Sequence, residues 1–150
     1  SFYNTFKGGK KEVFHKALLQ RREAFEEFKK VLDESGSPLD LIKDFFRSIA
    51  QADEETHLKG CIIANSVVEM AHLDHDLEME AVNILKEVEQ MFTDAIRKAQ
   101  DSKRINNPTD PEILGRYLIT FWCGLNTLRR MYSDRKILLH QIEMQLAVIS

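Results

Sequence analysis

The stretch TDPEILGRYLITFWCGLNTL, residues 109–128, indicates the fold class of this chain. Its apolar side chains recur every three or four residues, which is the spacing of one face of an α-helix and not the alternation of a β-strand. The four residues Thr109 to Glu112 form a capping box with a proline inside it, a pattern that starts helices. The sequence therefore predicts a helix with a broad apolar surface, formed by Ile113, Leu114, Tyr117, Leu118, Phe121, Trp122, Leu125 and Leu128.

This helix and the last one, which Ser133 or Asp134 caps, carry more apolar surface than one face of a bundle requires. Gly115 and Gly124 lie inside the first of them, where each costs about 1 kcal/mol relative to alanine unless another helix approaches closely. We therefore expect both helices to face their own core and a second copy of the chain, in a two-fold four-helix seam. The residues expected in this dimer interface are Leu118, Phe121, Leu125, Leu128, Leu138 and Ile142.

The rest of the chain continues the helical periodicity, and strand-like alternation is absent. A short aromatic segment ends at Gly8 and Gly9, a pair that predicts a break in the chain. Ser37 and Pro38 are typical of an N-cap followed by the first helical residue. The predicted fold class is all-α, a single helical bundle, with the upstream helices spanning about 10–33, 38 onward, 55–71 and 76–102.

Length and composition restrict the class of protein. The 150 residues suffice for one domain, and 43% hydrophobic with 30% charged residues argues against disorder. No apolar run reaches the roughly 18 residues of a membrane span. The two cysteines have no metal-binding or redox spacing, which favours a reduced, cytoplasmic setting. Residues 1–32 hold eight Lys or Arg and four Glu, so this end of an otherwise acidic chain is the one suited to nucleic acid.

Motifs for catalysis are missing from the sequence. It contains no Gly-rich phosphate loop, nucleophile elbow or paired-carboxylate motif. Cys123 and His140 are the residue types of a nucleophile pair, but both are expected inside packed helices. We therefore expect neither an enzyme nor a cofactor.

A dense group of metal-ligand types occurs at His72, Asp74, His75 and Asp76. Zinc takes such side chains as ligands. Their spacing fits no common zinc site, whereas Asp74 or Asp76 is well placed to cap the helix that follows. We favour the capping interpretation and predict no metal site.

Two stretches of the sequence resemble the TetR family of bacterial transcriptional regulators. Residues 1–6, SFYNTF, followed by Lys10, Val13, Phe14 and Leu18, look like the end of the family's recognition helix running into the helix that links headpiece and body. Residues 60–65, GCIIAN, with Glu69, are similar to a segment of the central helix in the family's C-terminal domain. The order and lengths of the predicted helices agree with the family over all 150 residues.

The resemblance implies two parts of the chain. Residues 1–14 would be the end of a helix-turn-helix headpiece, and residues 15–150 an effector-binding and dimerisation domain. The segment before the family's lysine is one residue longer here, which leaves open whether Lys10 or Lys11 takes that lysine's place. The first two helices of the headpiece are absent from this sequence, so we expect the chain as given not to bind operator DNA.

The resemblance also implies residue roles. Tyr3, Thr5 and Lys10 match positions that contact DNA phosphates, which fix the register of a protein on the duplex. Their alternative role is packing of the headpiece. Cys61, Asn65 and Glu69 share one helix face and would either line a ligand cavity or form an internal hydrogen-bond network. The complete set of candidate ligand-binding residues is Phe45, Phe46, Cys61, Asn65, Val68, Phe92, Trp122 and Asn126, for which plain core packing is the alternative.

The function that follows from the resemblance is a ligand-responsive transcriptional regulator, most simply a repressor. Its partners would be palindromic operator DNA for the intact protein, a small-molecule effector and a second copy of the chain. An all-helical interaction or adaptor module without a ligand is the alternative function, because it uses the same helices but needs no cavity.

Overall fold

The computed structural model describes residues 2–51 and 74–150, with side chains described at residue 9 and from residue 11 onward within these ranges. These residues form helices and no strands, which confirms the predicted all-α fold. The elements are α1 (Phe2–Glu34), α2 (Pro38–Ile49), α4 (His75–Asp101), α5 (Pro111–Met131), α6 (Arg135–Leu146) and the short 3-10 helix η1 (Ala147–Ile149). The predicted helix over 55–71 lies outside the described residues.

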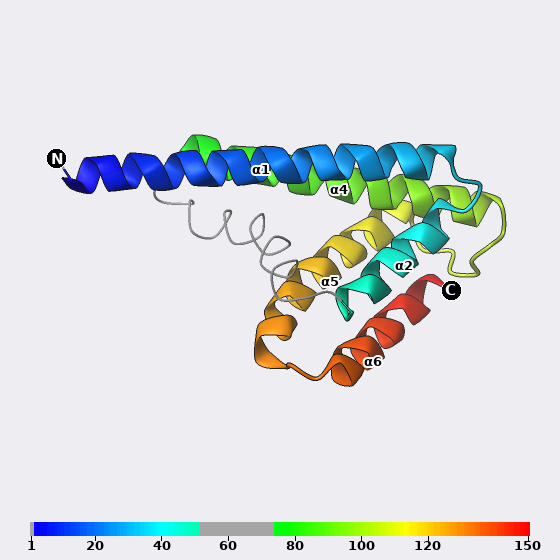
Figure 1. Ribbon diagram of the computed structural model, residues 1–150. Coiled ribbons are helices and arrows are strands. Elements are labelled where there is room, and N and C mark those ends of the chain that lie inside the picture. Colours follow the sequence, from blue (N-terminus) through cyan, green and yellow to red (C-terminus); the bar gives the residue numbers. More distant parts are fainter. Residues whose placement is uncertain (1, 52–73) are drawn as a thin grey trace.

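Helix α1 is continuous for 33 residues, so the predicted break at Gly8 and Gly9 is wrong. Glycine weakens a helix by about 1 kcal/mol relative to alanine but does not forbid it, and a helix of this length continues through the pair. The first turns of α1 extend beyond the start of α4, with α1 lying alongside that helix (Figure 1). The N-terminal segment and the body are therefore joined by one helix.

Polar contacts join α1 and α4 along their length. Their residue numbers rise together on both helices, so the helices run parallel: Lys11 to Asp74 at 2.6 Å, His15 to Glu80 at 3.0 Å and Arg22 to Glu87 at 3.4 Å. Most of these side chains are partly exposed to solvent, and exposed pairs contribute little to stability. They fix the register of the two helices and contribute little to the stability of the fold.

Short polar signals fix where the helices begin. Asp74 caps α4 by accepting a hydrogen bond from the backbone N–H of Leu77 at 3.0 Å, as the capping interpretation predicts. Asp134 caps α6 in the same way. The cap of α5 is Asp110 and not Thr109, because the Asp110 carboxylate accepts the N–H of Glu112 at 2.9 Å.

Helix α2 begins as the sequence predicts, at Pro38 after Ser37. The Ser37 side chain makes no cap hydrogen bond to α2. Its hydroxyl oxygen accepts a hydrogen bond from the Arg104 guanidinium instead. The turn between α1 and α2 is thereby tied to the segment that follows α4.

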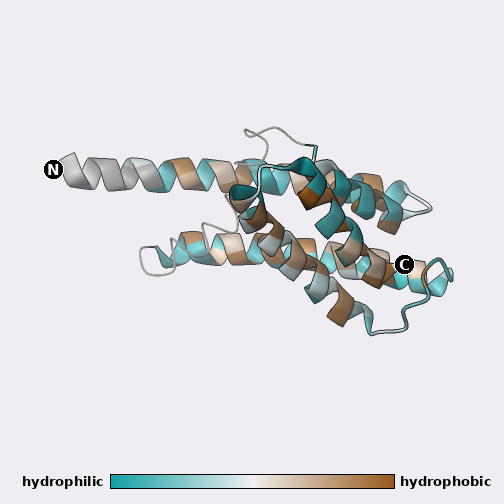
Figure 2. Cartoon of the chain, turned by 90° about the horizontal axis from the view of Figure 1, so that it is seen from below, coloured by the Kyte–Doolittle hydropathy of each residue, from teal (hydrophilic) through white to brown (hydrophobic). Residues whose placement is uncertain are grey.

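The core lies between α4 and α5, with α1 and α2 packed against it. Gly115 allows the two central helices to approach closely, because a Cβ there would lie 3.2 Å from the Thr93 Cβ and 3.3 Å from the Glu89 carbonyl oxygen. Hydrophobic residues recur along each helix (Figure 2). Fully buried side chains of this core include Phe46, Phe92, Ile96, Leu118, Leu125 and Ile142.

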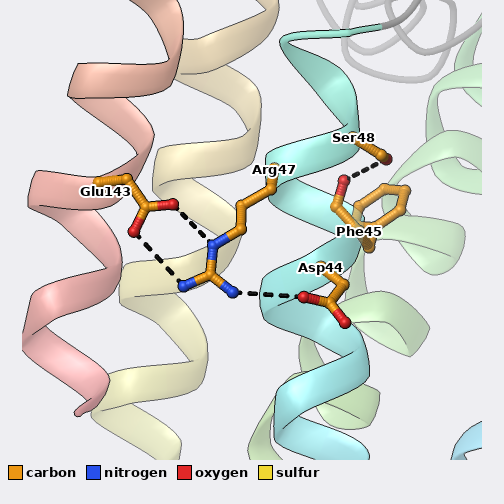
Figure 3. A network of polar contacts seen from close by, with 5 residues as sticks. All are labelled: Asp44, Phe45, Arg47, Ser48 and Glu143. Atoms are coloured by element: carbon orange, nitrogen blue, oxygen red, sulfur yellow. Dashed lines mark hydrogen bonds and ion pairs between the residues drawn. The ribbon is translucent and has the colours of Figure 1, made fainter.

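Helix α6 is attached to the bundle by polar contacts on two sides. Arg47 of α2 donates to both carboxylate oxygens of Glu143, at 2.6 and 3.4 Å, and to Asp44 at 3.2 Å (Figure 3). The Tyr117 hydroxyl of α5 donates to the backbone carbonyl of Gln145 at 2.5 Å. These polar contacts join α6 to α2 through Arg47 and to α5 through Tyr117, in addition to the shared hydrophobic core.

Candidate functional site

The candidate site lies where the middle of α1 meets the inner side of α5. The Phe25 ring of α1 contacts the Trp122 ring edge-on, with centroids 5.9 Å apart. Trp122, Asn126 and Arg129 recur at three- and four-residue spacing, so they share one side of α5. An aromatic wall and two polar groups are therefore combined inside the bundle.

Asn126 is the polar centre of this group. It is only 4% exposed, and its side-chain oxygen accepts a hydrogen bond from the Arg129 guanidinium. Arg129 is itself half-buried. Burying an amide beside a guanidinium costs desolvation free energy. Such a pair among apolar neighbours is typical of the few polar groups that orient a ligand in an apolar pocket.

Phe45, Phe46 and Phe92 belong to a separate aromatic cluster in the core. Phe46 is fully buried and its ring lies 5.6 Å from Phe45, 5.7 Å from Phe92 and 5.2 Å from Phe121, nearly parallel to the last. Such contacts match the packing alternative for these residues. Among the described ligand candidates, Trp122 and Asn126 are the two that adjoin a buried polar group.

Several predicted site residues are not described. Cys61, Asn65 and Val68 lie outside the described residues, as do Glu69 and His72. The side chains of Tyr3, Thr5 and Lys10 are also outside them, although their backbone belongs to α1. Their assignments to ligand and DNA stay predictions.

Lys11, the other candidate for the family lysine, has a partner in the body. Its ammonium lies 2.6 Å from the Asp74 carboxylate, the N-cap of α4. The hydrogen bond and charge of Lys11 lower the pKa of Asp74, and Asp74 raises the pKa of Lys11. An ion pair therefore joins the N-terminal part of α1 to the start of α4.

The residues considered for metal and nucleophile chemistry have other surroundings. Asp74 is occupied as a helix cap and by Lys11. Within the described ranges, no three or more His, Cys, Asp or Glu side chains group as metal ligands. Burial raises the pKa of the Cys123 thiol, which disfavours the thiolate, and His140 is exposed.

A groove of about 350 Å³ runs between α1 and α4 beside Phe25. Its floor includes Val88 and Met91, and both are almost fully covered by their neighbours. Charges of both signs line its edge, from Glu26 and Lys29 among others. None of the predicted ligand residues within the described ranges lines this groove.

The outer sides of α5 and α6 each carry exposed apolar side chains in a row. On α5, Ile113 and Met131 are 53% and 64% exposed, and they lie in line with Gly124 between them. On α6 and η1 the row is formed by Ile137, Met144 and Val148, which are 48%, 57% and 40% exposed. We call these two rows together the outer apolar rows. They lie opposite the core-facing residues of the same helices.

The residues predicted for the dimer interface need a correction. Five of the six are already buried within the single chain: Leu118, Phe121, Leu125, Leu138 and Ile142. Leu128 is half-buried. Their stripe packs into the core of the chain itself, and the exposed apolar side chains of the same helices are those of the outer apolar rows.

Comparison with known proteins identifies the family. The family described as "Tetracyclin repressor-like, C-terminal domain" matches residues 38–144. The chain belongs to the TetR family of transcriptional regulators. It is 28% identical over 140 residues to the HTH-type transcriptional repressor DhaR of Mycobacterium sp. (strain GP1), which covers 90% of this chain and 66% of that protein. The chain thus spans slightly less than two thirds of that relative, and no solved structure matches it significantly.

Family membership confirms the resemblance found in the sequence. The family is one of transcription regulators, and the relative is described as a transcriptional repressor. The match begins at α2 and ends within α6, so it includes Trp122, Asn126 and the outer apolar rows as far as Met144. No helix in the described parts of the chain has the length and hydropathy to span a membrane.

Proposed function

We propose that this TetR-family chain is the sensing and dimerising body of a cytoplasmic, effector-controlled repressor. Residues 1–14 form the end of the DNA-binding headpiece and residues 15–150 the body. The intact protein binds a palindromic operator as a homodimer and leaves it when a small molecule occupies each subunit. The relative's printed description as a transcriptional repressor supports repression over activation.

The observation that carries the proposal is the continuity of α1. One helix contains the headpiece residues at its start and Phe25, which touches Trp122, in its middle. Tyr3 and Phe25 are about 33 Å apart along a helix that rises 1.5 Å per residue. A tilt of about 5° at Phe25 then moves the headpiece end by about 3 Å, because displacement grows with distance along the helix.

Two such displacements change the distance between the headpieces of a dimer. Headpieces must lie about 34–36 Å apart to reach successive major grooves of DNA. A ligand that favours a different spacing weakens operator binding, and operator DNA weakens ligand binding by the same factor. The mechanism therefore needs a ligand at the Phe25–Trp122 contact and a fixed dimer seam.

The outer apolar rows supply the seam. Gly124 lies mid-helix with no described atom within 4 Å of the position of an added Cβ, so no residue in the described part of the chain explains a glycine there. Close approach of a second copy of α5 explains it. Isologous packing of α5 and α6 against their symmetry mates then covers Ile113, Met131 and Met144.

The test uses the full-length protein that contains this chain. Selection from a randomised DNA pool is expected to enrich two-fold symmetric sites with half-sites about one helical turn apart. Light scattering of residues 1–150 is expected to give the mass of two 17.4 kDa chains. Asymmetric sites, or a monomeric body at micromolar concentration, would contradict the proposal.

A further inference from the structure

Arg21 is a half-buried cation on the inner side of α1. Burial lowers the pKa of its guanidinium, and it makes no hydrogen bond or ion pair with any residue that the structure describes. Its neighbour Arg22 differs, because that side chain reaches Glu87 of α4 at 3.4 Å. Placing a charge in a partly apolar environment is unfavourable unless an opposite charge or hydrogen-bond acceptor joins it.

The position of Arg21 relates it to the candidate site. It lies one turn before Phe25, on the side of α1 that also carries Phe28, whose ring meets Phe45 of α2. Phe25 in turn contacts Trp122. Arg21 therefore lies on the side of α1 from which Phe25 and Phe28 meet Trp122 and Phe45, whereas Arg22 reaches α4.

The polar residues of α5, Asn126 and Arg129, follow Trp122 in the direction in which Arg21 lies from Phe25 on α1. α1 runs parallel to α4, as Arg22 and Glu87 show, whereas α5 runs antiparallel to α4. Moving from Phe25 back to Arg21 and from Trp122 forward to Asn126 therefore leads toward the same end of the bundle (Figure 1). A guanidinium from α1 and an amide from α5 lie on the same side of one aromatic contact.

We propose that Arg21 anchors the negative group of the effector, which is an organic anion with an apolar body lying against Phe25 and Trp122. This inference rests on the proposed function and specifies its ligand class. A planar guanidinium binds a carboxylate or sulfonate through two parallel hydrogen bonds, which an ammonium cannot do. The bound anion supplies an opposite charge that no residue described in the structure gives to Arg21.

The test compares two dyes with one aromatic frame. 1-Anilinonaphthalene-8-sulfonate carries a sulfonate, and N-phenyl-1-naphthylamine is its neutral counterpart. Trp122 is the single tryptophan of the chain, so energy transfer from tryptophan to dye reports binding beside it. The titrations use residues 1–150, the variant R21M, and the variant R22M as a neighbouring control that also removes one positive charge.

We expect R21M to weaken binding of the anionic dye at least tenfold and to change binding of the neutral dye less than twofold. R22M should leave both dissociation constants within twofold. The melting temperature of unliganded R21M should equal or exceed that of the unsubstituted chain, because an unpaired half-buried charge is removed. A purely structural Arg21 would lower that temperature when replaced.

Each contrary result has a distinct meaning. Equal weakening of both dyes in R21M, or a clear drop in its melting temperature, would overturn the role of Arg21 as an anion anchor. If the neutral dye shows energy transfer from Trp122 and R21M binds the anionic dye as tightly as the unsubstituted chain, the ligand class is wrong. The effector site itself would still stand. Absence of saturable transfer with either dye would refute the interior site of the proposed function itself.

Discussion

Replacing the two mid-helix glycines of α5 by alanine separates contacts within the chain from contacts between chains. Gly115 faces α4, where an added Cβ overlaps the Thr93 hydroxyl and lies 3.3 Å from the Glu89 carbonyl oxygen. Gly124 faces open space in the single chain. The two substitutions are chemically identical and nine residues apart on one helix, so each is a control for the other.

The expected magnitudes follow from these surroundings. In G115A the strain of an overpacked contact costs about 1–3 kcal/mol, and displacing the Thr93 hydroxyl breaks its 2.9 Å hydrogen bond to Glu89, about 1 kcal/mol. The better helix propensity of alanine returns about 1 kcal/mol, which leaves a net loss of about 2 kcal/mol. In G124A only the gain remains for the isolated chain, about 1 kcal/mol.

For the dimer dissociation constant, the larger effect is expected from G124A and the smaller from G115A. At a two-fold seam, G124A adds two methyl groups where helices approach closely, so the dimer dissociation constant should rise tenfold or more. G115A should change that constant little. Urea unfolding in dilute solution measures the stability of the chain, and sedimentation equilibrium measures the dissociation constant. If G124A leaves dimerisation within twofold of the unsubstituted chain, the seam does not pass over Gly124 and the reasoning fails.

Three further predictions concern Glu143, Asp74 and the lysines Lys10 and Lys11. E143Q should cost about 0.5 kcal/mol at pH 7, since both partners are exposed and solvent screens the pair. Arg47 lowers the pKa of Glu143 below 4.5, so this difference persists above that pH and disappears as the pH falls through the folded-state pKa, which urea midpoints from pH 7 to pH 3 would follow. D74A should lose the cap of α4, about 1 kcal/mol, and D74N should retain most of it; equal losses in calorimetry would contradict the capping role. In the full-length repressor, K10M should reduce the salt dependence of operator binding by about 0.9 per phosphate contact, whereas K11M, which loses only the body ion pair, should not; the reverse order in binding titrations would exchange the two roles.

Helix ends were predictable where a local signal has a single meaning. A serine followed by proline begins α2, where the fixed φ of Pro38 suits the first helical position. Aspartates begin α4 and α6, because their carboxylates accept hydrogen bonds from backbone N–H groups of the first turn. The predicted break at Gly8 and Gly9 was wrong because glycine lowers helix stability without enforcing a turn. The cap of α5 shifted by one residue because Thr109 and Asp110 both suit an N-cap.

The sequence could not show which surface packs against the apolar stripe of α5. Phe121 and Leu125 form an apolar stripe that the periodicity shows clearly, but periodicity does not say whether the same chain or a second copy covers it. The two glycines of α5 indicate close helix contacts but not which helix makes them. Gly115 and Gly124 carry the same signal in the sequence, yet one meets α4 and the other has no described neighbour.

The candidate site was predicted on one helix and missed on the other. Trp122 and Asn126 stood out because a polar residue interrupts an apolar face beside a large aromatic ring. On α1, neither Phe25 nor Arg21 was among the predicted site residues. Their relation to Trp122 depends on how α1 crosses α5, which is a tertiary property that no local spacing encodes.

The distribution of contacts along α1 suits the motion that the proposed function requires. Toward its end, α1 is held by buried apolar side chains such as Leu32, with Phe28 against α2, and each such side chain contributes about 1.5–3 kcal/mol. Toward its start, Lys11 and His15 make partly exposed polar contacts with α4, which are weak, and Phe14 packs only partly buried against the core. A helix fixed at one end and lightly held at the other pivots near its fixed end when its middle is pushed. A ligand against Phe25 therefore works against the weaker set of contacts, and the displacement is largest at the headpiece.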